Sequence, residues 1–211
     1  LHYPLRRQRQ MCIRDRDVPV AMADISDLKM TIVTNDPTKR YYYTLLFDDK
    51  YRVKIATRNI NIPGVQNFRD LGGYPSYSTK KQMRWGMIYR SAEIDSLECS
   101  SRRELKNLGI KTLIDLRASS EIGRQSPLQK GFNVVHIPLA TGDMEGILKG
   151  IREEKIKSDT VYRMVERMNR ILIDQYTKEY RQIFDILLDK NSYPVVIHCS
   201  SGKGRTGIVS A

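Results

Sequence analysis

The chain has 211 residues, of which 40% are hydrophobic, and it carries a formal net charge of +12 at pH 7. This length suits one domain, or one domain with part of a second, and the hydrophobic fraction is sufficient for a buried core. No apolar run approaches the length of a membrane-spanning helix, which excludes a hydrophobic span within this sequence. The positive charge is spread out and forms no basic strip interleaved with aromatic residues, so we do not expect a nucleic-acid partner.

Residues 1–16 differ from the rest of the chain. They hold five Arg and one Asp, supply +4 of the net charge and lack a hydrophobic pattern. We interpret this segment as non-native sequence, of the kind that read-through of a sequencing adapter produces, and exclude it from the fold. Cys12 lies in it, which leaves Cys99 and Cys199, so we expect no disulfide framework. The compartment, cytoplasmic or exported, stays undecided.

Residues 17–62 form a β-rich region. The runs 41–47 and 51–56 are rich in strand-forming residues and are separated by Asp48-Asp49-Lys50, which predicts a hairpin. A hairpin is not stable by itself. Two interpretations therefore stay open: a partial β module whose beginning is missing, or an irregular extension packed on the next domain. We place that next domain at residues 63–211.

The segment Asn67–Gly73 reads Asn-Phe-Arg-Asp-Leu-Gly-Gly. Arg69 and Asp70 are able to pair with each other, and the double glycine permits a tight turn. We call these residues the NFRDLGG segment.

Strands and helices alternate after this segment, which favours a mainly parallel central sheet flanked by helices. A capping box at Ser101–Glu104 predicts the start of a short helix, and Gly109 predicts its end. Apolar residues repeat at three- and four-residue steps through 144–190, which predicts helices. The predicted strands are 87–90, 110–116, 132–137 and 195–197.

The last eighteen residues, Pro194–Ala211, read PVVIHCSSGKGRTGIVSA. His198 and Cys199 stand where the predicted strand ends, Ser200–Gly204 is a loop with two glycines, and Arg205 opens a new apolar run. A strand, a tight loop and a helix N-terminus together form a cradle for an anion, because backbone N–H groups and the helix dipole point at it.

Cys199 gives this cradle its chemistry. A thiol beside N–H donors, a guanidinium and a helix N-terminus ionises below its usual pKa. Arg205 is suited to binding two phosphate oxygens at once. Thr206 can donate its hydroxyl to the sulfur when the thiolate leaves. These residue types point to hydrolysis of a phosphate ester through a phosphocysteine intermediate.

The loop HCSSGKGRTG resembles the phosphate-binding loop of the protein tyrosine phosphatase superfamily, and the NFRDLGG segment resembles a bacterial branch of it. The resemblance implies the cysteine-phosphatase fold, with Cys199 as nucleophile, Arg205 as phosphate clamp and no cofactor or metal. It implies a phosphate-binding set consisting of Ser200, Ser201, Gly202, Lys203, Gly204, Arg205 and Thr206. It implies a supporting set near the loop, consisting of His198, Arg69, Asp70, Arg90 and Asp115.

The general acid is the least defined part of the site. Relatives in this branch often have Asp directly before the loop arginine, where this chain has Gly204. We expect Asp143 to act as the acid, with Asp115 second and Asp70 third; an N-cap or loop role for Asp143 stays equally open. The resemblance also implies a helical lid, for which Glu145–Ser158 is the candidate.

The sequence therefore predicts a cysteine-dependent protein-tyrosine phosphatase. Its expected substrates are phosphotyrosine proteins or a broader set of phosphomonoesters, including phosphoserine, phosphothreonine and phosphoinositides. The alternatives are a phosphate-binding pseudophosphatase and a rhodanese-like sulfurtransferase. We expect the sequence to be a fragment at both ends, with a C-terminally incomplete catalytic domain, and expect residues 17–211 to be marginally stable.

Overall fold

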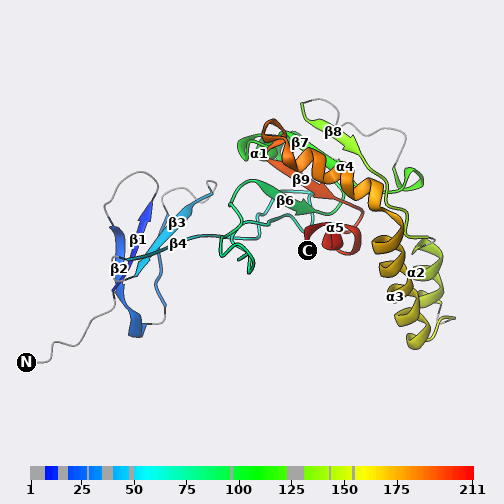
Figure 1. Ribbon diagram of the computed structural model, residues 1–211, viewed down its shortest axis with the longest axis horizontal. Coiled ribbons are helices and arrows are strands. Elements are labelled where there is room, and N and C mark those ends of the chain that lie inside the picture. Colours follow the sequence, from blue (N-terminus) through cyan, green and yellow to red (C-terminus); the bar gives the residue numbers. More distant parts are fainter. Residues whose placement is uncertain are drawn as a thin grey trace, which may run out of the picture. The chain divides into compact units, whose positions relative to one another are not determined.

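The computed structural model describes residues 8–13, 19–27, 29–34, 40–47, 50–95, 97–122, 131–142, 144–153 and 155–211 (Figure 1). The chain divides into two compact units. The first comprises residues 1–58 and 73–85, and the second comprises residues 59–72 and 86–211. The predicted boundary between residues 62 and 63 stays a prediction.

The first unit contains a four-stranded antiparallel sheet in the order β2-β1-β3-β4. Strands β3 (Tyr42–Phe47) and β4 (Tyr51–Ala56) form the predicted hairpin; Asp48 and Asp49 of its turn lie outside the described residues. Strand β1 (Gln8–Ile13) pairs with β2 (Pro19–Asp24) and with β3. The structure thus places part of the N-terminal segment in a sheet, while the interpretation of residues 1–16 as non-native stays a prediction.

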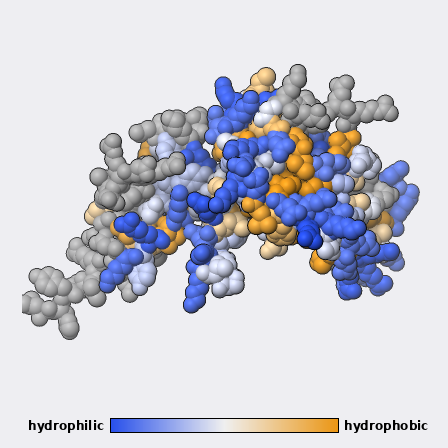
Figure 2. Space-filling model, turned by 45° about the horizontal axis from the view of Figure 1, so that its top comes forward, coloured by the Kyte–Doolittle hydropathy of each residue, from blue (hydrophilic) through white to orange (hydrophobic). Residues whose placement is uncertain are grey.

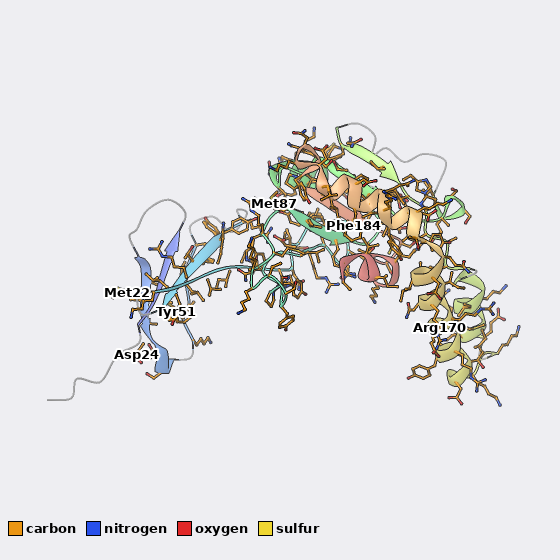
Figure 3. All side chains as sticks on the ribbon, viewed as in Figure 1. Met22, Asp24, Tyr51, Met87, Arg170 and Phe184 are labelled. Atoms are coloured by element: carbon orange, nitrogen blue, oxygen red, sulfur yellow. The ribbon has the colours of Figure 1, made fainter. Side chains whose placement is uncertain are left out.

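The second unit is built on a five-stranded sheet in the order β5-β6-β9-β7-β8. Strands β6 (Ile88–Ser91), β9 (Val195–His198), β7 (Thr112–Asp115) and β8 (Asn133–His136) run parallel, and only β5 (Arg69–Asp70) is antiparallel, to β6. The mainly parallel sheet predicted from the alternation of elements is therefore confirmed. At the start of the pairing, the carbonyl of Met87, labelled in Figure 3, accepts a hydrogen bond from Val195.

The central strands β7 and β9 are buried along their whole length, because helices cover both faces of the sheet. Leu113 and Val196 pack on one face with Leu105 of α1 (Cys99–Asn107). The alternate residues Ile114 and Ile197 pack on the other face. Residues from α3 (Ser158–Gln175), α4 (Thr177–Leu188) and α5 (Gly204–Ser210) cover that second face.

The predicted capping box is wrong. Helix α1 begins at Cys99, and its N-cap residue, Glu98, makes no side-chain capping bond. Ser101 lies inside the helix, where its buried hydroxyl donates to the carbonyl of Pro63. The predicted end is confirmed, since Gly109 has a φ of 73° and its N–H bonds to the carbonyl of Lys106.

The predicted helical region consists of α2 (Met144–Arg152), α3 and α4. The lid role of Glu145–Ser158 stays a prediction. On the face drawn in Figure 2, the hydrophobic surface forms one large area and several smaller ones, and hydrophilic side chains cover much of the rest. None of the helices formed by the described residues is long and apolar enough to cross a membrane.

Candidate active site

The nucleophile candidate lies at the carboxyl end of the central strand β9. Cys199 follows this strand directly and is buried, with 2% of its surface exposed. The chain then turns through residues 200–203 and enters α5 at Gly204. The predicted arrangement of strand, loop and helix is therefore present around Cys199. Ligands of open α/β sheets bind at this edge, beyond the carboxyl ends of the strands.

Two opposing effects set the pKa of Cys199. Burial raises the pKa of the thiol. Its neighbours lower that pKa by more, so that it lies below the ordinary value. These neighbours are the hydroxyl and N–H of Thr206, which act through hydrogen bonds, the positive charge of Arg205 and the N–H of Gly202. Thr206 is fully buried, and its hydroxyl has no nitrogen or oxygen partner among the described residues. That hydroxyl is therefore available to the sulfur.

The guanidinium of Arg205 is held by a residue that the sequence analysis missed. Glu121 accepts hydrogen bonds from Nη1 at 2.5 Å and from Nη2 at 2.7 Å, so the two side chains form a bidentate ion pair. Nη1 also lies 3.4 Å from the carbonyl of Leu116 and 3.3 Å from that of Leu139. Arg205 is only 7% exposed, so these contacts fix its direction within the protein interior.

Glu121 also binds the loop itself. Ser200 donates its hydroxyl to Oε1 of Glu121 at 2.7 Å and accepts from Nη2 of Arg205 at 3.1 Å. The hydrogen bonds from Arg205 lower the pKa of Glu121 to about 2, against the opposing effect of burial, and Ser200 and the N–H of Ala118 add to the lowering. Glu121 is thus an ionised carboxylate that joins Arg205 to the beginning of the loop.

His198 is completely buried at the end of β9, with Nδ1 3.9 Å from Oδ1 of Asp115. Burial lowers the pKa of His198 to about 4, so the ring is neutral at physiological pH. Neither ring nitrogen has a hydrogen-bond partner in the described part of the chain. The ring therefore contributes packing beneath Cys199 in this structure.

Asp115 is occupied by a buried arginine. Its carboxylate accepts from Nε and Nη2 of Arg117, at 3.0 and 2.7 Å, and Arg117 also pairs with Asp95. Burial raises the pKa of Asp115, but Arg117 and His198 lower it by more, so the pKa lies below its ordinary value. A carboxyl group in this state holds a proton poorly at neutral pH. This weakens the case for Asp115 as the acid.

The NFRDLGG segment and β6 lie behind the loop. The buried carboxylate of Asp70 accepts from the N–H groups of Gly72 and Gly86, at 2.7 and 2.8 Å, and so shapes the turn after β5. Arg69 pairs with Arg90 in the β5–β6 ladder. Arg90 donates to the loop carbonyls of Gly202 and Lys203, at 2.6 and 3.2 Å.

The model of the tyrosine phosphatase family matches residues 60–211, which is most of the chain. The chain belongs to the tyrosine phosphatase family. It is 30% identical over 172 residues to the triple specificity protein phosphatase PtpB of Mycobacterium tuberculosis. It is 25% identical over 149 residues to a candidate tyrosine-protein phosphatase of Cupriavidus necator.

These alignments cover 71% and 69% of this chain, and 60% and 53% of the two relatives. The chain therefore spans little more than half the length of the curated relatives that it matches. Among solved structures, P. aeruginosa TpbA in complex with pTyr aligns at 17% identity and a TM-score of 0.31, over 65% of this chain and 64% of that chain.

Within this phosphatase-family chain, most of the predicted site residues come together. Cys199, Arg205 and the residues between them form one loop, against which Arg90 packs, while His198 and Asp115 lie at its base. Asp143 lies outside the described residues. Glu121 was missed because no local pattern marks it. The available signal was its place in the turn after β7, at the same edge of the sheet as Cys199.

Proposed function

We propose that this tyrosine phosphatase family member is a cysteine-dependent phosphatase that hydrolyses phosphomonoesters through a phosphocysteine. One observation carries the proposal: a buried thiol begins the strand–loop–helix cradle, beside an arginine that buried contacts hold in place. The surroundings of this thiol lower its pKa. The nucleophile and the group that neutralises phosphate charge are thus both in position before substrate binds.

In the first step, the thiolate of Cys199 attacks phosphorus and forms an S–P bond. The P–O bond to the leaving group breaks, and the leaving oxygen takes a proton from a general acid. Arg205 and the backbone N–H groups of residues 200–206 stabilise the negative charge on the phosphoryl oxygens. Because Glu121 binds Nη1 and Nη2 of Arg205, it fixes the orientation in which the guanidinium would meet the phosphoryl group.

In the second step, water attacks phosphorus and gives a proton to the carboxylate of the general acid, the S–P bond breaks and inorganic phosphate leaves. The electron pair returns to sulfur, so the thiolate is regenerated. The hydroxyl of Thr206 stabilises this developing charge, as its lowering of the Cys199 pKa indicates. The supporting evidence is that Thr206 is fully buried in the first turn of α5, which directly follows the loop that begins at Cys199.

We propose Asp143 as the general acid, on the sequence argument. The structural support is indirect: Asp115 is bound to Arg117, and Asp70 is buried against backbone N–H groups, so neither is well placed to release a proton to a substrate. Phosphotyrosine proteins are the proposed substrates. The name of PtpB, a triple specificity phosphatase, supports including other phosphomonoesters.

The test is release of inorganic phosphate by the chain and by Cys199→Ser. Substrates are phosphotyrosine and phosphoserine peptides and a phosphoinositide. We expect release that disappears in Cys199→Ser. Consumption of thiosulfate in the presence of cyanide would instead support the sulfurtransferase. A folded protein that binds phosphopeptide without releasing phosphate would support the pseudophosphatase. The family match does not favour either alternative.

The role of Asp143 is tested with two aryl phosphates that differ in leaving group. We expect Asp143→Asn to reduce kcat strongly for phenyl phosphate, whose leaving group needs a proton. The reduction for p-nitrophenyl phosphate should be much smaller, since nitrophenolate leaves without protonation. Equal reductions for the two substrates would contradict general-acid catalysis by Asp143.

A further inference from the structure

The backbone carbonyls on the outer side of the phosphate loop are all occupied by donors. Ser200 accepts from the N–H of Glu93 at 3.2 Å. The side-chain amide of Asn67 donates to the next two carbonyls, those of Ser201 at 3.0 Å and Gly202 at 3.1 Å. Through its bonds to Gly202 and Lys203, Arg90 completes this outer set of contacts.

These contacts determine where the N–H groups of the loop point. The carbonyl of one residue and the N–H of the next belong to one planar trans peptide and point in opposite directions. If the carbonyls of residues 200–203 are held on the outside, the N–H groups of residues 201–204 face the inside. The inward hydrogen bond from the N–H of Gly202, which lowers the pKa of Cys199, agrees with this direction.

We propose that Asn67 is a positioning residue that, together with Arg90, holds the phosphate loop in its anion-binding conformation. The proposal rests on the proposed function in one respect: the anion that the loop binds is the phosphoryl group of the substrate. Asn67 itself does not contact substrate. Its effect passes through the orientation of two consecutive peptide units, at Ser201 and Gly202.

Asn67 is well suited to this task for two reasons. Its carboxamide nitrogen carries two N–H donors, and the structure places one loop carbonyl within reach of each. Its backbone has a φ of +56°, in the left-handed region that Asn tolerates better than most residues. The first residue of the NFRDLGG segment thus supplies both the turn and the donor.

The test compares three variants of the full chain. Asn67→Gly removes the amide and keeps the left-handed backbone without strain. Asn67→Asp keeps the shape but replaces the donor with an acceptor that repels the loop carbonyls. Lys80→Gly is the matched control, since Lys80 also has a positive φ, +53°, and lies on an exposed turn in the other unit.

The probe is inorganic phosphate, measured by calorimetry and as a competitive inhibitor, with urea unfolding as a check on the fold. Loss of the two hydrogen bonds from Asn67 to the carbonyls of Ser201 and Gly202 is expected to weaken phosphate binding by about 10-fold or more in Asn67→Gly, and further in Asn67→Asp. Lys80→Gly should bind phosphate like the unaltered chain. Hydrogen exchange at the amides of residues 201–204 should be faster in both Asn67 variants.

Unchanged phosphate binding in folded Asn67→Gly and Asn67→Asp would overturn the proposal. If Asn67→Gly does not fold, Asn67→Asp decides, because it keeps the side-chain volume. Failure of the proposed function is distinguishable: the unaltered chain would then release no phosphate from any substrate, yet the variants would still weaken binding of inorganic phosphate.

Discussion

Replacing Gly202 with alanine should disrupt the phosphate loop. Gly202 has a φ of +66°, and a Cβ added there would lie 2.4 Å from the carbonyl oxygen of Ser91 and 2.5 Å from its carbon. Ordinary van der Waals contact begins at 3.4 Å, so the overlap is about 1 Å against backbone atoms of β6, which cannot rotate away. The loop must therefore shift, or the protein must carry the strain.

The cost can be worked from these two features. A left-handed backbone at a residue with a Cβ costs about 1–2 kcal/mol. Overpacking of a tight contact costs about 1–3 kcal/mol. Together they predict a loss of about 2–5 kcal/mol in the free energy of unfolding, a substantial part of the 5–15 kcal/mol that is typical of domains. Any relief by movement of the loop would displace the N–H groups that we propose to bind the phosphate.

The assay is urea unfolding together with phosphate release, with Gly204→Ala as the matched control. A Cβ at Gly204 meets no atom within 4 Å, and the residue begins α5. We expect Gly204→Ala to stay within about 1 kcal/mol of the unaltered chain. If Gly202→Ala retained both the stability and the activity of Gly204→Ala, the close approach of β6 to the loop would be refuted.

Three further predictions concern charge and protonation. Thr206→Val should raise the pKa of Cys199, because it removes the hydroxyl that lowers this pKa, and alkylation of Cys199 by iodoacetamide should then begin at higher pH. Thr206→Ser keeps the hydroxyl and should leave this pH profile unchanged. Cys199→Ser measures the background alkylation of the other cysteines. Glu121→Gln should lower kcat more than it raises KM for p-nitrophenyl phosphate, because Arg205 loses its ion pair; an unchanged kcat would count against a positioning role. The same substitution should change the pH dependence of the free energy of unfolding. The pKa of Glu121 falls from 4.5 to about 2 on folding. The ionised carboxylate therefore stabilises the fold fully above about pH 4.5, and this contribution is lost as the pH falls towards 2. The stability of Glu121→Gln should therefore decline less over that range, and parallel curves for the two proteins would contradict the shift.

Local patterns were sufficient for much of the fold. The hairpin β3–β4 and strands β6 to β9 follow from short β-rich runs bounded by turn residues, and the helices of 144–190 follow from their apolar repeat. The N-cap of α1 was predicted at Ser101, three residues after the observed N-cap Glu98, because Ser101 donates a tertiary hydrogen bond to Pro63 instead of capping the helix. Capping signals have a purely local meaning only when no distant acceptor competes for the hydroxyl.

The sequence by itself determined the chemistry of the site. A buried strand, Cys199, glycines that permit close approach, and Arg205 lie within one continuous segment, so their spacing is readable without a fold. Only the tertiary structure brought in Glu121, which is 84 positions from Arg205, and Asn67, which is 134 positions from Ser201. The physical reason is the register of the parallel sheet: β6, β9 and β7 end level with one another, with Ser91 and Asp115 both opposite His198. The segments that follow these strands therefore meet at one edge, and Asn67 reaches the same edge because it precedes β5, which runs antiparallel to β6. There the second set of residues can hold the loop that the first set forms.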